Sequence, residues 1–405
     1  MKKYKSLQST NLKIQNYITI LSMIREKVMS RAEIANVVGM SRPAVSSIIK
    51  ELIDEGLVKE IGHGETSEVG GKRPILLDID ERAGNILSVY YDGAVLQMAI
   101  CNLKADILVQ EQVDLPVTTD EEAILDKISE YLNAFVKAES EARIIACGFV
   151  MKGIVNTITS TLQYSVALPE WENVSIGKVL EKQLQIPVFI ENDARAQTLD
   201  LLKQEQNHYN TFVSVKVDTG IGTGVALDNQ LYRGAFEGAV NFAHTTVHDE
   251  GPLCICGNYG CWEALASTTA LLHKVETVTK EKGLSIQDII LRYNKGEAGI
   301  RDIVNNYTAY WIGVGLANIA RVFQPEKIVL LSVLNAFQAP FRENVKEIYN
   351  RKSSPAFNRS LIAFEEVDDN LQLRSAAEVV CSYFYSADFH EGIWRNNDYS
   401  SMKEG

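Results

Sequence analysis

Cysteines are few in this chain, and long apolar segments are missing. Six cysteines in 405 residues are too few for the disulfide framework of a small secreted protein, so any that cluster are first considered as metal ligands. No apolar run reaches the ~18 residues that a membrane-spanning helix needs. Residues 10–15 are polar where a signal peptide has its apolar centre. We therefore expect a cytosolic protein with no membrane contact.

Charge is unevenly distributed along the chain. The net charge is −12, yet residues 1–80 hold 12 Lys and Arg against 10 Asp and Glu, and the remainder holds 28 against 42. A mildly basic N-terminal part can approach nucleic-acid phosphates, whereas the acidic body cannot attract them. The composition, 46% hydrophobic and 23% charged, is typical of globular proteins, and the length suggests two or three domains.

The first 80 residues predict helices followed by a two-stranded hairpin. Ser30 and Glu33 have capping-box spacing at the start of a helix over 31–38. Ser41 caps the next helix, and Pro43 suits its first turn because no N–H partner is needed there. Strands are expected at 57–61 and 73–79. This order is typical of a winged helix-turn-helix domain, which we assign to residues 1–80.

One face of the helix that Ser41 opens carries polar groups at four-residue spacing, opposite its apolar stripe. Such groups let a recognition helix reach base edges and phosphates in the major groove. The wing segment 70–74 adds a basic tip that could follow phosphates or enter a minor groove. The same pattern also fits an ordinary solvated helix face. We expect contacts with double-stranded operator DNA from Arg42, Ser46, Ser47, Lys50, Lys72 and Arg73.

After about residue 82 the sequence alternates between β-rich and helical segments, which is typical of an α/β fold. Strands are expected at 86–91, 96–101, 143–150, 188–190, 211–217, 224–227 and 328–331. Helical segments are expected at 123–138, 176–184, 264–320 and 375–385. The domains that we expect after the winged helix-turn-helix are a first lobe, a second lobe with a cysteine loop, and a polar tail: 81–195, 196–385 and 386–405.

Three cysteines lie within eight residues of a glycine-containing loop, namely Cys254, Cys256 and Cys261. Such a loop can bring three thiolates together, and thiolates with an imidazole suit Zn²⁺ better than Mg²⁺ or Ca²⁺. His244 is the preferred fourth ligand and His248 the alternative. With four protein ligands the zinc would be structural. Three buried or redox-sensing thiols are the other interpretation.

These motifs together resemble the ROK family of repressors, open reading frames and sugar kinases, and in particular its xylose-repressor and glucose-type repressor branch. The similarity covers roughly residues 10–385. It implies a two-lobed body with the actin-like ATPase, or ribonuclease H-like, fold and a sugar cleft between the lobes. The motifs that carry it are the head ending in Gly70-Gly71-Lys72-Arg73-Pro74, Glu191-Asn192-Asp193-Ala194, Gly220-Ile221-Gly222-Thr223-Gly224, and the cysteine string ending at Glu263.

The resemblance implies a set of sugar-binding residues. In the family's kinases the Asp of the Asn-Asp pair is the general base, which corresponds to Asp193, while Asn192 would hold a neighbouring hydroxyl. The family's His and the Glu after the last Cys also contact sugar, which points to His244 and Glu263. A Glu of the family is replaced here by Asn241, an amide that both donates and accepts.

Departures from the kinase pattern concern the nucleotide. The kinases' Asp-x-Gly-Gly-Thr phosphate loop corresponds to Tyr90-Tyr91-Asp92-Gly93-Ala94, where a ring and a misplaced carboxylate would oppose phosphate. The Gly-Gly beside adenosine corresponds to Leu331-Ser332-Val333. The second Gly-rich loop, 220–224, is intact. We therefore expect no enzyme activity.

The sequence as a whole predicts a sugar-responsive transcriptional repressor that forms at least a homodimer. The effector would be a monosaccharide or a sugar phosphate, the latter with Lys152 or Arg195 nearby. Trp171 could stack on a sugar face or belong to the core. Two alternatives remain: a ROK sugar kinase with a DNA-binding head, and a repressor controlled by a protein partner instead of a sugar.

Overall fold

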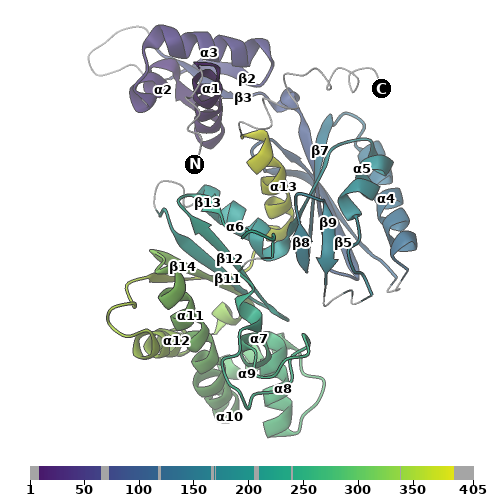
Figure 1. Cartoon of the computed structure of the whole chain (residues 1–405), viewed down its shortest axis with the longest axis vertical. Coiled ribbons are helices and arrows are strands. Elements are labelled where there is room, and N and C mark those ends of the chain that lie inside the picture. The colour runs from purple at the N-terminus through teal and green to yellow at the C-terminus, as the bar shows by residue number, and fades with distance from the viewer. Residues whose placement is uncertain are drawn as a thin grey trace, which may run out of the picture.

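The computed structural model describes residues 9–64, 73–116, 120–165, 168, 170–204, 209–238, 240–337 and 339–386. Figure 1 shows a small N-terminal head, a first α/β lobe and a second α/β lobe, with the C-terminal helix α13 (Leu371–Phe384) near the junction of head and first lobe. Within this described part of the chain, no helix is both long and apolar enough to cross a membrane.

Three helices and a small sheet form the head. Its elements are α1 (Ser9–Glu26), β1 (Met29–Ser30), α2 (Arg31–Val38), α3 (Arg42–Asp54), β2 (Val58–His63) and β3 (Ile75–Ile79), with strand order β1-β3-β2. The predicted capping box is present, because the Ser30 N–H donates to the Glu33 carboxylate at 2.8 Å and the Glu33 N–H donates back to Ser30 Oγ at 3.3 Å. Gly39 ends α2 with a φ of +67°, which favours glycine. The winged helix-turn-helix is thus confirmed.

The first lobe is a five-stranded sheet covered on both faces. Its strands pair in the order β10-β7-β4-β5-β6. The apolar residues of one face pack under α4 and α5, and those of the other face pack under α6 and α13. The elements are β4 (Asn85–Tyr91), β5 (Val95–Asn102), β6 (Ile107–Asp114), α4 (Glu121–Ala138), β7 (Ile144–Met151), α5 (Ile176–Leu184), β10 (Val188–Asn192), and the separate pair β8 (Ile154–Asn156) and β9 (Thr161–Tyr164).

The second lobe repeats this plan with the strand order β13-β12-β11-β14-β15. Its larger core lies between the sheet and the helices that follow it. The strands are β11 (Phe212–Val217), β12 (Ile221–Leu227), β13 (Gln230–Leu231), β14 (Lys327–Ser332) and β15 (Leu361–Glu365). The helices are α7 (Trp262–Ala266), α8 (Thr268–Thr279), α9 (Ile286–Asn294), α10 (Ala298–Asp302), α11 (Ala309–Phe323) and α12 (Ala339–Ser353).

Helix α6 (Asp193–Gln204) lies between the two lobes. Ala196 and Leu199 pack against the first sheet and α13, whereas Leu201 packs against β11 and β14 of the second sheet. Glycines of β12 allow the close approach of this helix: a Cβ at Gly224 would lie 1.8 Å from Thr198 Oγ1. The two lobes therefore share α6 as a common wall.

The contacts of α13 differ from the expected second lobe, 196–385. After β15 the chain returns to the first sheet, where α13 packs on β4 and β7 and joins the core of the head. The reason is the apolar face of α13, which fills the space between that sheet and α1. Residues 387–405 of the expected tail lie outside the described residues.

Candidate functional site

The DNA-facing candidate is helix α3. Ser41 Oγ accepts from the Ala44 N–H at 3.4 Å, and Pro43 stands in the first turn, as predicted. Four buried residues anchor the helix in the head: Val45, Ile48, Ile49 and Leu52. The opposite face is open to solvent at three of its four predicted contact residues, and Ser46 is half-buried.

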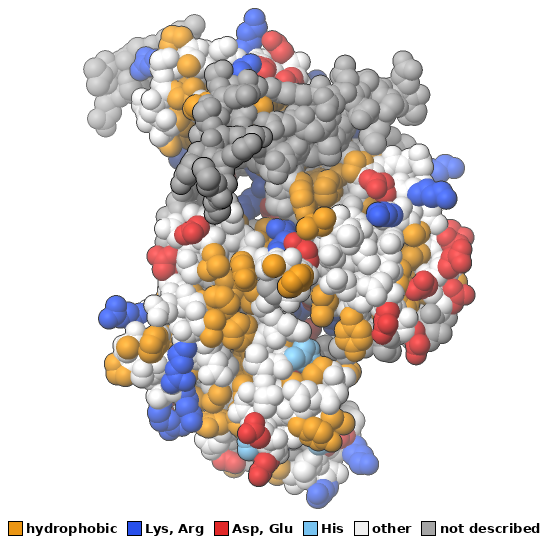
Figure 2. All heavy atoms as spheres, in the orientation of Figure 1, with side chains coloured by type: hydrophobic (Ala, Val, Ile, Leu, Met, Phe, Trp, Pro, Cys, Tyr) orange, Lys and Arg blue, Asp and Glu red, His pale blue; other side chains and the backbone are white. Residues whose placement is uncertain are grey.

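The two cations on α3, Arg42 and Lys50, have no ion-pair partner within the described part of the chain. By contrast, acidic side chains gather along the edge of the first lobe where α4 lies (Figure 2). Of the two predicted wing residues, Arg73 is exposed just before β3, and Lys72 lies outside the described residues. An external polyanion can therefore reach α3 without first displacing a salt bridge.

A cleft of about 1200 Å³ opens between the lobes. All five predicted sugar-binding residues line it: Asn192, Asp193, Asn241, His244 and Glu263. Asn192 ends β10 and Asp193 starts α6, which places the pair at the carboxyl end of a parallel strand, where α/β folds commonly bind ligands. Trp171 instead is 1% exposed in the core of the first lobe, beside Tyr91.

Asp193 sits in a buried polar contact that joins the lobes. Its Oδ2 lies 3.2 Å from Nζ of Lys216 on β11, and its Oδ1 accepts from the Asn192 amide at 3.2 Å. That amide also donates to the Gly153 carbonyl at 2.9 Å. The buried phenol of Tyr90 lies near Asp193. Burial of the phenol, and next the negative charge of Asp193, raise the pKa of Tyr90 well above its ordinary value. Lys216 was not predicted as a site residue. The feature that could have indicated it is a lysine within the mostly apolar sequence of β11.

Arg195 forms an ion pair and hydrogen bonds with protein groups in the wall of the cleft. Its guanidinium lies 2.6 Å from the fully buried carboxylate of Glu191 and donates to the Val155 carbonyl at 2.7 Å and to the Glu237 carbonyl. Glu191 also pairs with Arg233 at 3.0 Å. Arg195 is therefore occupied by protein groups, while Lys152 reaches Thr219 Oγ1 at 3.4 Å from the partly exposed rim.

Both loops that resemble phosphate loops have backbone N–H groups occupied by the protein's own carboxylates. Asp92 Oδ1 accepts from the N–H groups of Ala94 at 2.9 Å and Val95 at 2.8 Å. In the second loop, Glu263 Oε2 accepts from the Ile221 N–H at 2.8 Å. A bound phosphate would have to displace these carboxylates.

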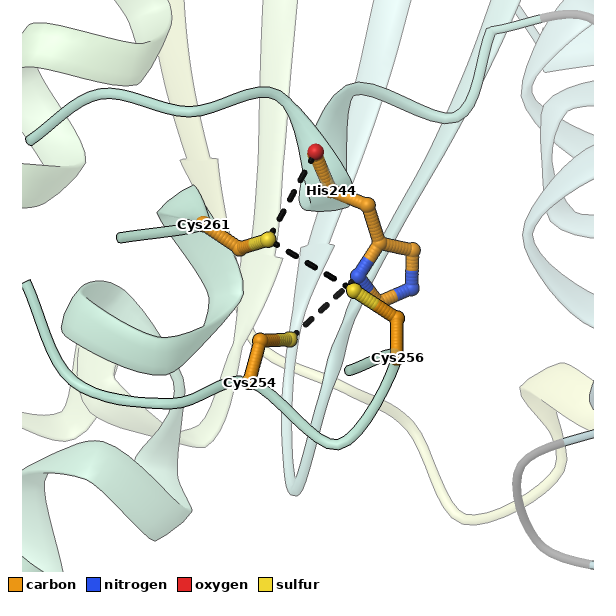
Figure 3. Close-up of side chains that lie close together, drawn as sticks. All are labelled: His244, Cys254, Cys256 and Cys261. Carbon is orange, nitrogen blue, oxygen red and sulfur yellow. Dashed lines mark hydrogen bonds between the residues drawn. The ribbon is translucent and has the colours of Figure 1, made fainter. Parts of the chain in front are cut away.

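One histidine and three cysteines could hold a metal ion at the edge of the cleft. Ligand atoms of His244, Cys254, Cys256 and Cys261 all lie within 4.8 Å of one another. Figure 3 shows the Nδ1 edge of His244 turned toward the sulfurs, 3.5 Å from Cys254 Sγ. The three cysteines lie on one loop. An antiparallel backbone bridge between Thr246 and Cys261 brings this loop next to the short helix that contains His244.

His248, the alternative ligand, lies outside this cluster and stacks on Trp311 with ring centroids 5.5 Å apart. Three sulfurs and one imidazole in a compact group fit a tetrahedral, thiolate-binding ion. The fourth position is filled by a protein ligand, so such an ion would have no vacancy for substrate.

A buried charge cluster connects the far end of α6 to the head. Glu378 of α13 accepts two hydrogen bonds from Arg25 of α1, at 2.6 and 2.7 Å, and its Oε1 lies 2.9 Å from Nζ of Lys203 on α6. Arg25 also lies 4.7 Å from the ring centroid of Tyr385. Helix α6 thus contacts the cleft at Asp193 and the head junction at Lys203. No sequence motif indicated this cluster.

Comparison with known proteins gives the same two parts. The ROK family profile matches residues 87–377, and a winged helix-turn-helix DNA-binding profile matches residues 18–59. The chain is 28% identical over 380 residues to the xylose repressor of Bacillus subtilis, covering 92% of this chain and 96% of the relative. It is 22% identical over 371 residues to the DNA-binding transcriptional repressor Mlc of Escherichia coli, covering 88% and 90%.

Solved structures share the fold. A ROK family transcriptional regulator described as a homolog of E. coli MLC superposes with a TM-score of 0.78 at 21% identity, covering 93% of this chain and 97% of that one. A ROK glucokinase from Streptomyces griseus, solved with glucose and AMPPNP, has a TM-score of 0.62 at 23% identity, covering 73% and 99%. Because the family profile spans well over half of its length and the two-lobed fold agrees, the chain belongs to the ROK family.

Proposed function

We propose that this protein is a sugar-responsive transcriptional repressor that binds operator DNA through its winged head. The observation that carries the proposal is the cationic face of α3, where Arg42 and Lys50 have no ion-pair partner among the described residues. The core of this head is continuous with the core of the first lobe, which borders the cleft. The matched DNA-binding profile and the relatives named as repressors support it. Such a repressor works in the cytoplasm, where the operator is.

The effector in this proposal is a neutral monosaccharide. Among the residues lining the cleft, four cationic side chains face four acidic ones, so with neutral histidines the lining carries no net charge. A sugar phosphate would need an excess of positive charge, and Arg195 is already used by Glu191. The asparagine and carboxylate groups of the cleft suit hydroxyls, and relatives named for xylose make D-xylose the first probe.

Phosphoryl transfer is not part of the proposed function. Both phosphate-type loops are closed by Asp92 and Glu263, and Asp193 is engaged with Lys216. A coupled assay for ADP release with ATP, Mg²⁺ and a sugar panel is expected to give no turnover. Sustained sugar-dependent turnover would instead support the alternative, a sugar kinase with a DNA-binding head.

The metal in this proposal is a structural Zn²⁺ held by His244, Cys254, Cys256 and Cys261. Its role would be to hold the loop 254–261 in place beside the cleft. With Nδ1 of His244 directed to the sulfurs, the other ring nitrogen remains for a sugar hydroxyl, which would connect the metal loop with the effector.

Helix α6 provides a route from effector to DNA. A sugar that closes the lobes changes the position of Asp193, and the same rigid helix carries Lys203 at the junction with α1. We expect a homodimer, or a higher oligomer, because two heads are needed to read half-sites one helical turn apart. To switch operator occupancy nearly completely, the sugar must prefer the non-binding state by roughly 10⁴-fold, about 5.5 kcal/mol.

A two-part experiment tests the proposal. Fluorescence anisotropy with double-stranded fragments from upstream regions at fixed salt measures operator binding, and thermal shift across neutral and phosphorylated sugars measures effector binding. A sugar at about 100 times its Kd adds about 2.7 kcal/mol of stability. Specific DNA binding with a stabilising neutral sugar is expected. Specific DNA binding without any sugar response would instead favour control by a protein partner.

A further inference from the structure

Lys216 is a buried cation that, among the described residues, forms a single ion pair, with Asp193. It lies within the apolar strand β11, flanked by Val215 and Val217, and is 5% exposed, yet its side chain lines the cleft. Burying an ammonium in a strand is costly unless its hydrogen-bond donors are used. The hydrogen-bond acceptors around the ammonium group should therefore account for its burial.

The ammonium has three N–H donors, and among the described residues one acceptor is found, Asp193 Oδ2 at 3.2 Å. Asp193 keeps acceptor capacity as well, since each of its oxygens has one hydrogen-bond partner, from Asn192 and from Lys216. Donors and acceptors thus stand side by side at the floor of the cleft. Both side chains are mostly buried, and both line the cleft.

We propose that Lys216 is a specificity-determining residue that, with Asp193, binds two adjacent hydroxyl groups of a neutral sugar. This inference rests on the proposed function. The ammonium donates to one hydroxyl oxygen, while the carboxylate accepts a hydrogen bond from the neighbouring hydroxyl. Only a diol of the correct stereochemistry presents an acceptor and a donor to both groups together.

The placement of the pair favours a sugar over a phosphate as its ligand. Lys216 is already neutralised by Asp193, and Asp218 and Glu263 line the same cleft. A dianion would meet two further carboxylates there, whereas a diol makes hydrogen bonds with both members of the pair. Because Asp193 belongs to α6 and Lys216 to β11, the bound diol would lie where the two lobes meet.

Calorimetry on the full chain tests this with D-xylose and its single epimers D-lyxose, D-ribose and L-arabinose, changed at C2, C3 and C4. Wild type should distinguish the epimers. Lys216→Met should bind D-xylose about 10-fold or more weakly and should lose discrimination at one carbon or at two adjacent carbons only. Lys178→Met, which changes an exposed lysine of α5, is the matched control and should behave as wild type.

Circular dichroism and sugar-free operator binding establish that the variant is folded. If Lys216→Met does not fold, Lys216→Gln, whose side chain is one bond shorter and cannot place its amide donors where the ammonium lies, should lose discrimination at the same carbons. Equal weakening of all four sugars, or unchanged affinity and selectivity, would overturn the role of Lys216 while sugar sensing stands. If wild type bound none of the four sugars, nor D-glucose, both the inference and the proposed effector would fall, already before any variant is made.

Discussion

Helices α3 and α6 use charge in opposite ways. On α3, Arg42 and Lys50 project from an exposed face, without ion pairs in the described structure, while the other face is apolar. Helix α6 is buried almost throughout, yet it carries Asp193, Arg195 and Asp200, each held by an ion pair. Exposed unpaired charge is available to an outside polyanion, whereas buried paired charge fixes the parts of the protein relative to one another.

In the proposed repressor the two helices would act in successive steps, α6 on effector binding and α3 on DNA binding. A ligand can intervene in the α6 network at its cleft end, where Asp193 and Lys216 line the pocket. At the other end of α6, Lys203 pairs with Glu378 of α13, which in turn pairs with Arg25 of the head. Removing a paired or coordinated group should therefore have a larger effect than removing an unpaired one.

The largest effect is expected at the metal cluster, where His244 and His248 form a matched pair inside and outside the coordination group. His244→Ala should release the metal and with it a binding free energy on the order of 10 kcal/mol, whereas His248→Ala should retain it. Elemental analysis of the purified proteins measures this. A full equivalent of metal in His244→Ala would contradict the ligand set.

Breaking the buried pair at the head junction should have the next largest effect. Glu378→Ala leaves Arg25 buried without its main partner and should lower the free energy of unfolding by about 3–5 kcal/mol, measured by chemical denaturation. Lys127→Ala breaks the exposed pair with Glu130 on α4 and should cost less than about 0.5 kcal/mol. Equal effects would show that the α6 network is no stronger than a surface pair.

Removing an unpaired charge on α3 should affect DNA binding without affecting stability. Arg42→Ala is expected to weaken operator binding by about 1–3 kcal/mol, because a contact of the guanidinium with DNA is lost. Stability should not change, because Arg42 has no ion pair in the described part of the chain. Anisotropy titration at fixed salt gives this value, and denaturation should be unchanged. Operator affinity equal to wild type would remove α3 from the DNA interface.

The smallest effect concerns the capping box that starts α2. Hydrogen bonds from the Ser30 N–H and then its hydroxyl hold the pKa of Glu33 below its ordinary value. That contribution is therefore present at neutral pH and is lost as the pH falls through the lowered pKa. Ser30→Ala should cost about 1 kcal/mol at pH 7 and less near pH 3. A loss independent of pH would mean that the Ser30 hydroxyl does not bind the Glu33 carboxylate.

Local patterns predicted the head and the metal loop, because each depends on residues close in sequence. The capping residues Ser30 and Ser41 act within one turn, and the cysteines lie on one loop. Helix α6 was not predicted, since its polar sequence has no apolar stripe to mark it as buried. Only the tertiary partners of Asp193 and Lys203 explain its burial, and one of those partners, Glu378, also pairs with Arg25, 353 residues away in sequence.

The sugar site was predicted through family motifs and not from spacing, and the structure gathers those residues along one cleft. Short strands such as β13 and edge strands such as β6 and β15 were not predicted. Their residues alternate weakly or lie at the sheet edge, where burial does not impose a pattern. Lys216, the one charged residue of β11, also lines this cleft, although neither spacing nor a family motif marked it.

Operator affinity measured as a function of sugar concentration tests the central claim most directly. At fixed salt, the full chain should bind a specific operator fragment, and saturating D-xylose or another stabilising neutral sugar should weaken that binding by at least tenfold, within the range of common allosteric couplings. Affinity that stays constant while the same sugar demonstrably occupies the cleft would contradict a sugar-responsive repressor.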